Sequence, residues 1–349
     1  MQSREIDVEG WERVVHFTDE PSGLNAIICL HDTTIGPGCG GCRIYPYKSF
    51  EDGLHDVKNL SRGMTYKNAI GAIPFGGGKA VIIADPKTQK TPALLKAFGR
   101  AVQSLEGQYY TASDSGVSSD DMGVILSTTS YGAGAAASGA GGGPGPFTAR
   151  GVWRGMQAAA RFHYGAASLD GLRVAIVGIG SVGMELARLI HEEGGLLSVA
   201  DVNQAALQEA ETKFGAKTVS PDDIAGEDVD IFSPCALGGA INERTIEQLQ
   251  ARIVAGAANN QLASPQMGQR LVDKGILYAP DYVINGAGVI SVGLEIMGVY
   301  SPENMNARID NIGDTLSEIF QRAENSHAQT NVVADEMTME IINKARKTT

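Results

Sequence analysis

The sequence predicts a two-domain α/β protein: a mixed α/β domain, then a Rossmann domain with a doubly wound parallel sheet, and a cleft between them. Three observations predict this class. The second half carries a strand, a glycine-rich turn, a helix and a second strand in order. The first half mixes short apolar runs with helical patterns. A length of 349 residues is sufficient for two hydrophobic cores.

The Rossmann signal begins with a strand expected at Arg173–Val177, a nearly continuous apolar run. This run leads into Gly178–Gly183, which has the Gly-x-Gly-x-x-Gly spacing, and then into a helix that ends near Gly194. A second apolar strand, Leu196–Ala200, is followed by the acid Asp201. This order of elements is typical of a dinucleotide-binding unit.

Each part of this unit has a role in holding a dinucleotide. Gly178 permits the tight turn, Gly180 lets the backbone approach the pyrophosphate, and Gly183 lets the helix pack on the strand. Asp201 can accept hydrogen bonds from a ribose hydroxyl and would repel a 2′-phosphate. Because no Lys or Arg stands at 202–204, we expect NAD rather than NADP as the cofactor.

The remaining segments define the expected domains. Further strands are expected at Ala26–Leu30, Ala80–Ala84, Val229–Phe232, Ile253–Ala257 and Ile276–Ala279. The boundaries that follow are a substrate-binding and catalytic domain at 1–132, a Gly/Ala-rich hinge at 133–145, an NAD-binding domain at 146–325 and a helical tail at 326–349.

The first half contains a triple glycine that ends on a lysine. We expect Gly76–Gly78 to form a short loop that a ligand approaches closely, because three residues there lack side chains. Lys67 lies twelve residues before Lys79, and two ammonium groups in one buried site lower the pKa of a lysine toward that of a general base. Two solvated lysines are the alternative. The segment is not a P-loop, since Ile73 replaces the first glycine and Ala80 the hydroxyl residue.

Charge and cysteine content exclude several classes of function. A formal charge of -12 argues against a nucleic-acid partner. No apolar run reaches the length of a membrane span and the first residues are polar, so we expect a cytoplasmic protein. Cys39 and Cys42 form a Cys-x-x-Cys pair, but no second Cys/His pair occurs at metal spacing. We therefore expect no metal, and favour two packing residues beside a glycine turn over a redox pair.

Several further motifs occur in a fixed order along the chain. They are Gly36–Arg43, Gly63–Asn68, Gly76–Lys79, Thr111–Asp114, Pro234–Gly239, Ala257–Gln261 and Tyr278–Gly288. From about residue 10 to about 325 this set resembles the amino-acid dehydrogenases of the glutamate/leucine/phenylalanine/valine family, and within it the leucine/phenylalanine branch.

The resemblance implies a reversible, NAD-dependent oxidative deamination of an apolar L-amino acid to the 2-oxo acid and ammonia. It implies that Lys67 pairs with the substrate carboxylate and that Lys79 is the general base that activates water. It implies that Asp114 exchanges a proton with the amino group. Backbone amides of Gly40 and Gly41 are expected to close around the substrate.

Other roles follow from the same resemblance. Thr148 is expected near the nicotinamide, and Asn260, with or without Asn259, at the substrate carboxylate or the nicotinamide. Further residues expected to contact the cofactor are Cys235, Ala236 and Asn285. Family members assemble into dimers or octamers, so we also expect a homo-oligomer.

The residue before Gly40 bears on the choice of substrate. Glutamate dehydrogenases carry a lysine at that position; here it is Cys39, which offers no cation to a second carboxylate. The other pocket positions that the resemblance assigns are apolar: Met64, Ala112, Val289 and Val292. We expect leucine, valine or isoleucine as the substrate. Leucine enzymes usually have leucine where Cys39 stands, so an aromatic substrate, phenylalanine or tryptophan, is the alternative.

Two departures from the family pattern lie close to these positions. Ser113 and Ser115 flank Asp114 where the family often has Glu and Val, and the segment 285–288 reads Asn-Gly-Ala-Gly in place of Asn-Ala-Gly-Gly. A non-catalytic NAD-binding regulator is the alternative from another class. Such a protein would have no need of both lysines together with Asp114.

Overall fold

The computed structural model of the chain describes residues 1–135 and 145–347. The chain divides into two compact units. Unit 1 consists of the described residues of Met1–Gly143, with Val289–Pro302 and Thr338–Thr349; unit 2 consists of those of Pro144–Gly288, with Glu303–Met337. Both units are thus assembled from separate stretches of the chain. Most of the expected hinge at 133–145 lies outside the described residues.

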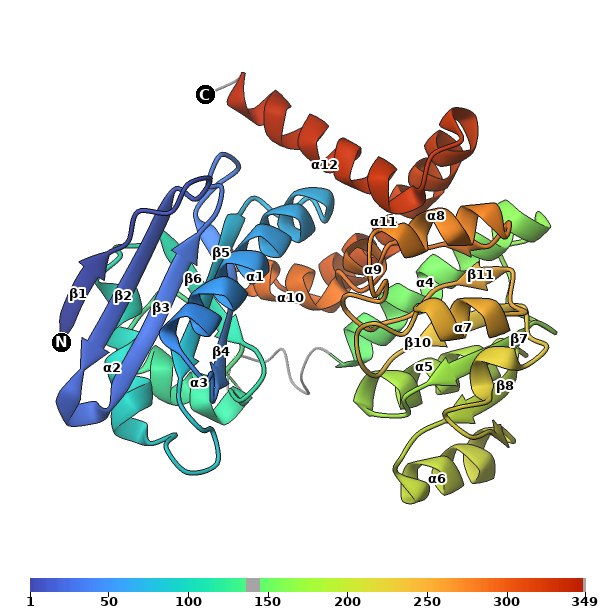
Figure 1. Cartoon of the computed structure of the whole chain (residues 1–349), viewed down its shortest axis with the longest axis horizontal. Coiled ribbons are helices and arrows are strands. Elements are labelled where there is room, and N and C mark those ends of the chain that lie inside the picture. Colours follow the sequence, from blue (N-terminus) through green and yellow to red (C-terminus); the bar gives the residue numbers. More distant parts are fainter. Residues whose placement is uncertain (136–144, 348–349) are drawn as a thin grey trace. The chain divides into compact units, whose positions relative to one another are not determined.

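Unit 1 contains a six-stranded mixed sheet (Figure 1). In spatial order its strands are β1 (Gln2–Glu5), β2 (Arg13–Asp19), β3 (Leu24–Leu30), β5 (Gly76–Ile83), β4 (Gly38–Tyr45) and β6 (Tyr109–Ser113). Strands β1, β2, β3 and β5 pair antiparallel, whereas β4 pairs in parallel with both β5 and β6. The carboxyl ends of β4 and β6 consequently lie at the same edge of the sheet.

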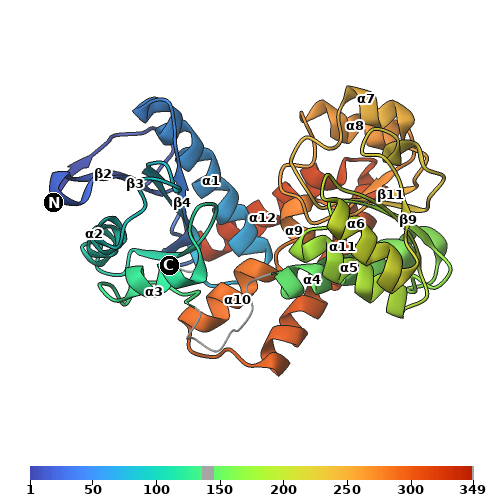
Figure 2. The same ribbon diagram turned by 90° about the horizontal axis from the view of Figure 1, so that it is seen from below.

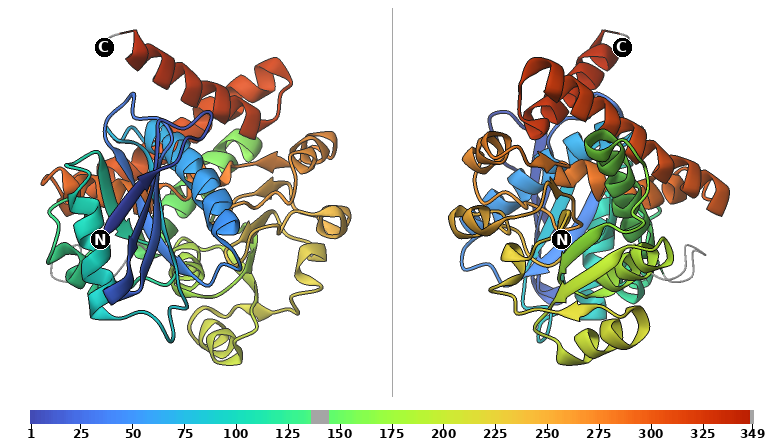
Figure 3. Two further views of the ribbon diagram at one scale, coloured as in Figure 1. Left: turned by 60° about the vertical axis from the view of Figure 1, so that its left-hand side comes forward. Right: turned by 90° about the vertical axis from the view of Figure 1, so that its right-hand side faces the viewer.

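Helices cover both faces of this sheet. The long helix α1 (Phe50–Ile70) packs on one face, and α2 (Pro92–Gln103) and α3 (Ser119–Leu126) pack on the other (Figure 3, left). Helix α1 begins at Ser49, whose side chain accepts a hydrogen bond from the amide of Asp52. The result is a three-layer arrangement with a hydrophobic core on each side of the strands.

The triple glycine belongs to strand β5, so the predicted loop at Gly76–Gly78 is wrong. A Cβ atom on Gly77 would lie 1.8 Å from Thr65 Oγ1 of α1, and one on Gly78 would lie 2.8 Å from the carbonyl carbon of Gly38 in β4. The glycines therefore let α1 and β4 approach the backbone of β5. These contacts join distant parts of the chain, and local composition does not reveal them.

The parallel sheet of unit 2 confirms the Rossmann prediction. Its strands are β7 (Arg173–Val177), β8 (Leu196–Ala200), β9 (Lys217–Thr218), β10 (Ile231–Pro234), β11 (Ile253–Val254) and β12 (Leu277–Tyr278). Their spatial order is β9-β8-β7-β10-β11-β12, the order of a dinucleotide-binding sheet, with its switch point between β7 and β10. Strands β7 and β8 match their predicted bounds exactly in residue number; β11 and β12 are shorter than predicted.

The helices of unit 2 lie on both faces of its sheet. They are α4 (Gly145–Tyr164), α5 (Ser181–Glu192), α6 (Gln204–Phe214), α7 (Glu243–Gln248), α8 (Gln266–Asp273), α9 (Asp281–Ile284) and α11 (Pro302–Ser326). Figure 2 and the right-hand view of Figure 3 show α7 and α8 on one face and α4 and α5 on the other. Buried side chains of α7 and α8 form the core of their face.

Two helices contribute to both units. Helix α10 (Ala287–Ile296) belongs to unit 1 from Val289 onward, and α12 (Thr330–Arg346) belongs to unit 1 from Thr338 onward. Helix α12 lies within the segment 326–349, where a helical tail is expected. Its last turn is fixed in unit 1 by an ion pair between Arg346 and Asp32. Within the described residues, no helix combines the length and hydropathy that a membrane span requires.

Candidate active site

An ion pair between a buried lysine and a partly buried aspartate lies in unit 1. Lys79 is in β5, and its Nζ lies 2.8 Å from Oδ2 of Asp114, which directly follows β6. The Lys79 side chain is 9% exposed and that of Asp114 22%. A Cβ atom on Gly41 of β4 would lie 2.5 Å from the carbonyl oxygen of Ser113 and 2.9 Å from Cβ of Asp114. The glycine at 41 is therefore what lets Asp114 come this close.

A second cation also faces Asp114. Arg43, in β4, has its Nε 3.3 Å from the same Oδ2 atom. Burial raises the pKa of Asp114, but the charges of Lys79 and Arg43 outweigh this effect and lower the pKa to about 2. Asp114 is therefore ionised at neutral pH. Arg43 lies within a motif noted in the sequence, but no role was predicted for it.

Helix α1 brings Lys67 and Met64 toward the same strands. Lys67 is half-buried in the last turn of α1. Met64 contacts the backbone at Gly40, where a Cβ atom would lie 2.9 Å from Met64 Cγ and 2.0 Å from the carbonyl oxygen of Gly78. A side chain at position 40 would therefore clash with both Met64 and the backbone of β5, so this position needs a glycine.

Asn68, which no sequence argument singled out, anchors this end of α1. It is fully buried, and its Nδ2 donates to the carbonyl oxygens of Cys39 (3.2 Å) and Gly76 (2.7 Å). One amide thus ties α1 to both β4 and β5. The neighbouring Lys67 is held in its position by this contact.

The expected apolar pocket positions all belong to unit 1. Cys39 and Ala112 are buried in β4 and β6, while Val289 and Val292 are half-buried on α10. Helix α10 packs closely on the segment before β5, since a Cβ atom on Gly293 would lie 2.7 Å from Ile73 Cγ2. The set of pocket positions therefore falls within one unit, although α10 is distant in sequence.

The two cysteines of the Cys-x-x-Cys motif lie within strand β4, so the glycine turn expected beside them is not present there. Cys39 and Cys42 are both buried, and burial raises the pKa of Cys39 to about 12 and that of Cys42 well above its ordinary value. Residues three apart on a strand point to opposite faces. Both are free thiols, and this geometry favours packing over redox chemistry.

The glycine-rich turn of unit 2 lies at the switch point of the sheet. Gly178 has φ +100°, and a Cβ atom there would lie 2.7 Å from Cβ of Ala236, which follows β10. A Cβ atom on Gly183, in the first turn of α5, would lie 2.0 Å from the carbonyl oxygen of Gly178. At Gly180 a Cβ atom would meet nothing within 4 Å. The turn is therefore closed on the protein side and open where a pyrophosphate would approach.

Asp201 lies directly after β8 and contacts the glycine-rich turn. Its Oδ2 accepts a hydrogen bond from the amide of Ile179 (2.6 Å), and its Oδ1 accepts one from the amide of Asn203 (2.8 Å). These bonds fix the carboxylate beside the turn. The residues at this corner thus fit a dinucleotide whose ribose hydroxyls need an acceptor.

The remaining predicted residues belong to unit 2. Asn285 donates from Nδ2 to Oδ1 of Asn259 (2.8 Å) and to the carbonyl oxygen of Ala257 (3.0 Å); within the described part of the chain no group donates to its own Oδ1. Asn260, expected at the substrate, is exposed with φ +52° and belongs to unit 2. Thr148 is half-buried in the first turn of α4.

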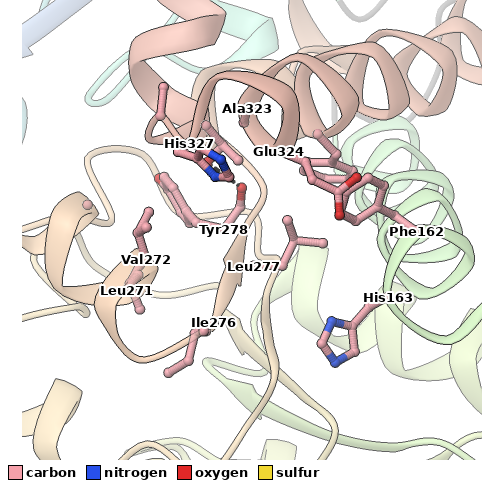
Figure 4. A pocket seen from close by; sticks show the side chains of 15 residues that line it. Phe162, His163, Leu271, Val272, Ile276, Leu277, Tyr278, Ala323, Glu324 and His327 are labelled. Atoms are coloured by element: carbon pink, nitrogen blue, oxygen red, sulfur yellow. Dashed lines mark hydrogen bonds between the residues drawn. The ribbon is translucent and has the colours of Figure 1, made fainter.

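Figure 4 shows a separate cavity of about 280 Å³ in unit 2. Apolar side chains line most of it, and two histidines, His163 and His327, stand at its wall. None of the predicted site residues lines this cavity. We therefore assign it no part in the site.

The fold, the lysine–aspartate pair of unit 1 and the glycine-rich turn of unit 2 together define a class of protein. A parallel sheet with a glycine-rich turn at its switch point, joined to a unit with a lysine–aspartate ion pair, is the framework of a dinucleotide-dependent dehydrogenase. The family model of the Glu/Leu/Phe/Val dehydrogenase dimerisation domain matches residues 11–131, and that of Glutamate/Leucine/Phenylalanine/Valine dehydrogenase matches residues 195–349.

Individual relatives match over nearly the whole chain. A leucine dehydrogenase of Geobacillus stearothermophilus is 47% identical over 98% of this chain and 93% of its own length, and an L-tryptophan dehydrogenase of Nostoc punctiforme is 46% identical over 97% and 95%. The crystal structure of L-tryptophan dehydrogenase from Nostoc punctiforme matches with a TM-score of 0.85 at 43% identity, covering 97% of both chains. The chain belongs to the glutamate/leucine/phenylalanine/valine dehydrogenase family and is an amino-acid dehydrogenase, which confirms the resemblance seen in its motifs.

Proposed function

We propose that this protein catalyses the reversible, NAD-dependent oxidative deamination of aliphatic L-amino acids, with leucine, valine and isoleucine as the preferred substrates. The Lys79–Asp114 pair beside the glycines of β4 and β5 is the observation that supports this most directly. Relatives called leucine dehydrogenase are 44–47% identical to the chain. The apolar character of the pocket positions supports the same class of substrate.

In this proposal the residues of unit 1 bind the amino acid and move its protons. Lys67 pairs with the α-carboxylate and fixes the orientation of the substrate. The ionised Asp114 takes a proton from the substrate ammonium, so that the nitrogen lone pair can form the C=N bond as the hydride leaves. Lys79, once it has released its own ammonium proton to solvent, takes a proton from the water that adds to the imine carbon. A proton returned to nitrogen lets ammonia leave and the 2-oxo acid form.

NAD is the cofactor that we propose. When bound, it supplies the acceptor for the hydride of the α-carbon. Gly178, Gly180 and Gly183 would hold its pyrophosphate, and Asp201 its adenosine ribose. Cys235, Ala236, Asn259, Asn285 and Thr148 are proposed to line the nicotinamide half. The open space at Gly180 supports a bound dinucleotide, and the carboxylate of Asp201 beside the turn supports NAD over NADP, since it would repel a 2′-phosphate.

An aromatic amino acid is the second candidate substrate. The relative from Nostoc punctiforme that is called L-tryptophan dehydrogenase is 46% identical to the chain. Cys39 is a small residue at a buried position, so an enlarged pocket would suit a ring. A difference of one or two methylenes in such a pocket is worth only about 1–3 kcal/mol, so the two substrate classes can overlap.

The test is NADH formation with leucine, valine, isoleucine, phenylalanine, tryptophan and glutamate. We expect the aliphatic amino acids to react fastest and glutamate not to react. We also expect Lys79→Met to lower kcat by about 100-fold or more while NAD still binds. A preference for phenylalanine or tryptophan would replace the aliphatic assignment, and a Lys79→Met variant that keeps near-native kcat would remove Lys79 from the mechanism.

Two further expectations concern the protein as a whole. We propose a homo-oligomer, which the match of residues 11–131 to a dimerisation domain supports. Light scattering after size-exclusion chromatography would reveal a single 36.6 kDa chain if this is wrong. The cytoplasmic location expected from the sequence stays a prediction.

A further inference from the structure

Arg43 lies beside Asp114 because of the parallel register of β4 and β6. Cys42 of β4 is directly opposite Ser113, the last residue of β6. Arg43, the next residue of β4, therefore comes beside Asp114, which directly follows β6. The Arg43 Nε is 3.3 Å from Asp114 Oδ2. No catalytic role assigned above uses this arginine.

The other side of the Arg43 guanidinium binds a second carboxylate. Its Nη1 lies 2.9 Å from Oδ2 of Asp56, on α1, and the hydroxyl of Tyr47 donates to the same oxygen. The Arg43 side chain is 26% exposed and that of Asp56 30%. Tyr47 and Asp56 thus hold the guanidinium in one orientation from the side opposite Asp114.

These contacts form one continuous row of alternating charge. It runs from the Tyr47 hydroxyl through Asp56, Arg43 and Asp114 to the ammonium of Lys79. The Oδ2 atom of Asp114 is shared between two cations, Arg43 on β4 and Lys79 on β5. A carboxylate held in this way keeps its negative charge and has little freedom to rotate.

We propose that Arg43 is a positioning residue for the deamination proposed above, and that Asp56 and Tyr47 in turn fix Arg43. The guanidinium holds Asp114 in its ionised form and directs it toward Lys79. Asp114 is then ready to take a proton from the substrate ammonium. Because Arg43 keeps the carboxylate a weak base, Asp114 can give the proton back when ammonia leaves.

The surroundings of Asp114 determine the sign of the effect. The groups that face it are Lys79 on β5, Arg43 and Cys42 on β4 and Tyr109 on β6. Burial raises the pKa of both the Cys42 thiol and the Tyr109 hydroxyl, so neither carries charge near neutral pH. Loss of the Arg43 charge must therefore raise the pKa of Asp114. Loss of the Asp56 charge has two opposing effects on the pKa of Asp114, because it removes a nearby anion and also frees the guanidinium that holds Asp114. We therefore expect it to change this pKa less than loss of Arg43 does.

The test compares Arg43→Gln with Asp56→Asn in the full-length protein. Both changes break the same Arg43–Asp56 contact, but they remove charges of opposite sign. The readout is the carboxylic-acid C=O band of protonated Asp114, followed against pH in infrared difference spectra with Asp114→Asn as the reference. Relative to wild type, we expect the band to appear at higher pH in Arg43→Gln, and to shift less in Asp56→Asn, which keeps the guanidinium. A band that appears in Arg43→Gln at the same pH as in wild type would overturn the proposal.

Kinetics provide a second readout. We expect Arg43→Gln to lower kcat for leucine oxidation by about tenfold or more with KM for NAD unchanged, and Arg43→Lys to recover part of the loss because it keeps the charge. A near-native kcat in Arg43→Gln overturns the proposal while the proposed function stands. If wild type turns over no amino acid of the panel, the proposed function fails, whatever the infrared bands show. Arg43→Lys also serves if Arg43→Gln does not fold, as circular dichroism would reveal.

Discussion

Single residues set the electrostatics of the site, and Asp114 is the clearest case. It lies within ion-pair distance of both Lys79 and Arg43, and its pKa of about 2 is below the model-peptide value of 3.8. A carboxyl group whose pKa is depressed by folding stabilises the protein above its unfolded pKa. This stabilisation is lost as the pH falls through the folded value.

The acid stability of the protein should therefore depend on this residue. From the pKa of about 2, ionised Asp114 contributes about 2 kcal/mol at neutral pH. We expect Asp114→Asn to unfold at a lower temperature than wild type at pH 7. The difference in melting temperature between the two proteins should become smaller as the pH falls from about 4 to about 2. Thermal unfolding followed by circular dichroism checks this. A gap that stays constant over this range would mean that the ion pairs do not stabilise the fold.

At the same scale, the sequence predicted some site residues and missed others. Lys79 and Asp114 were chosen because their motifs resemble a known family, and the structure brings their side chains together. Arg43 was missed because its partner is decided by strand pairing across some seventy residues. Asn68 was missed because this helix residue donates hydrogen bonds to backbone atoms of two strands, β4 and β5.

Among the elements, prediction succeeded where structure is local. The bounds of β7 and β8 were predicted correctly because each is a buried apolar run between turn residues. Strand β5 was mistaken in part for a loop, because its first three residues have no side chains to show an apolar pattern. Residues 76–78 are glycines because α1 and β4 approach this part of β5 closely, and only the tertiary structure reveals that approach.

A pair of alanine substitutions tests this account of β5. A Cβ atom on Gly77 would lie 1.8 Å from Thr65 Oγ1 and 2.5 Å from the carbonyl oxygen of Ser61, whereas one on Gly63, an exposed position on α1, would meet nothing within 4 Å. We expect Gly77→Ala to destabilise by about 1–3 kcal/mol or more through overpacking. We expect Gly63→Ala to stabilise by up to about 1 kcal/mol, because alanine favours a helix. Equal melting temperatures for the two variants would contradict the close-packing explanation.

In the whole molecule, sequence order and spatial order differ. The described residues of Val289–Pro302 and Thr338–Thr349 belong to unit 1 although the sequence between these two segments belongs to unit 2. Nothing in the local sequence marks the point at which the chain passes from unit 2 back into unit 1, since α12 is one uninterrupted helix. The contact is a packed one: Ile342 is 1% exposed and Met339 contacts the Tyr66 hydroxyl.

Two neighbouring isoleucines on α12 can be used to test how much the stability of unit 1 depends on the packing of this helix. Ile342 is 1% exposed and Ile341 is 39% exposed. We expect Ile342→Ala to destabilise unit 1 by about 2–4 kcal/mol and Ile341→Ala to have a small effect. Trp11 lies in unit 1 and Trp153 in unit 2, and they are the two tryptophans of the chain. Fluorescence of each, with the other replaced by phenylalanine, reports one unit. A loss confined to the Trp153 signal would contradict this prediction.

The shared helix α12 also has a consequence for synthesis on the ribosome. Unit 1 begins to form first, yet the residues that complete it are synthesised only after almost all of unit 2. Until then, the surface around Trp11 and Tyr66 that α12 later contacts stays uncovered. Contacts between residues that are far apart in the sequence form late in folding. Until they form, the exposed apolar surface can bind chaperones or other nascent chains. A ribosome stalled before it reaches Thr338 would therefore carry a chain whose first half is still unfinished.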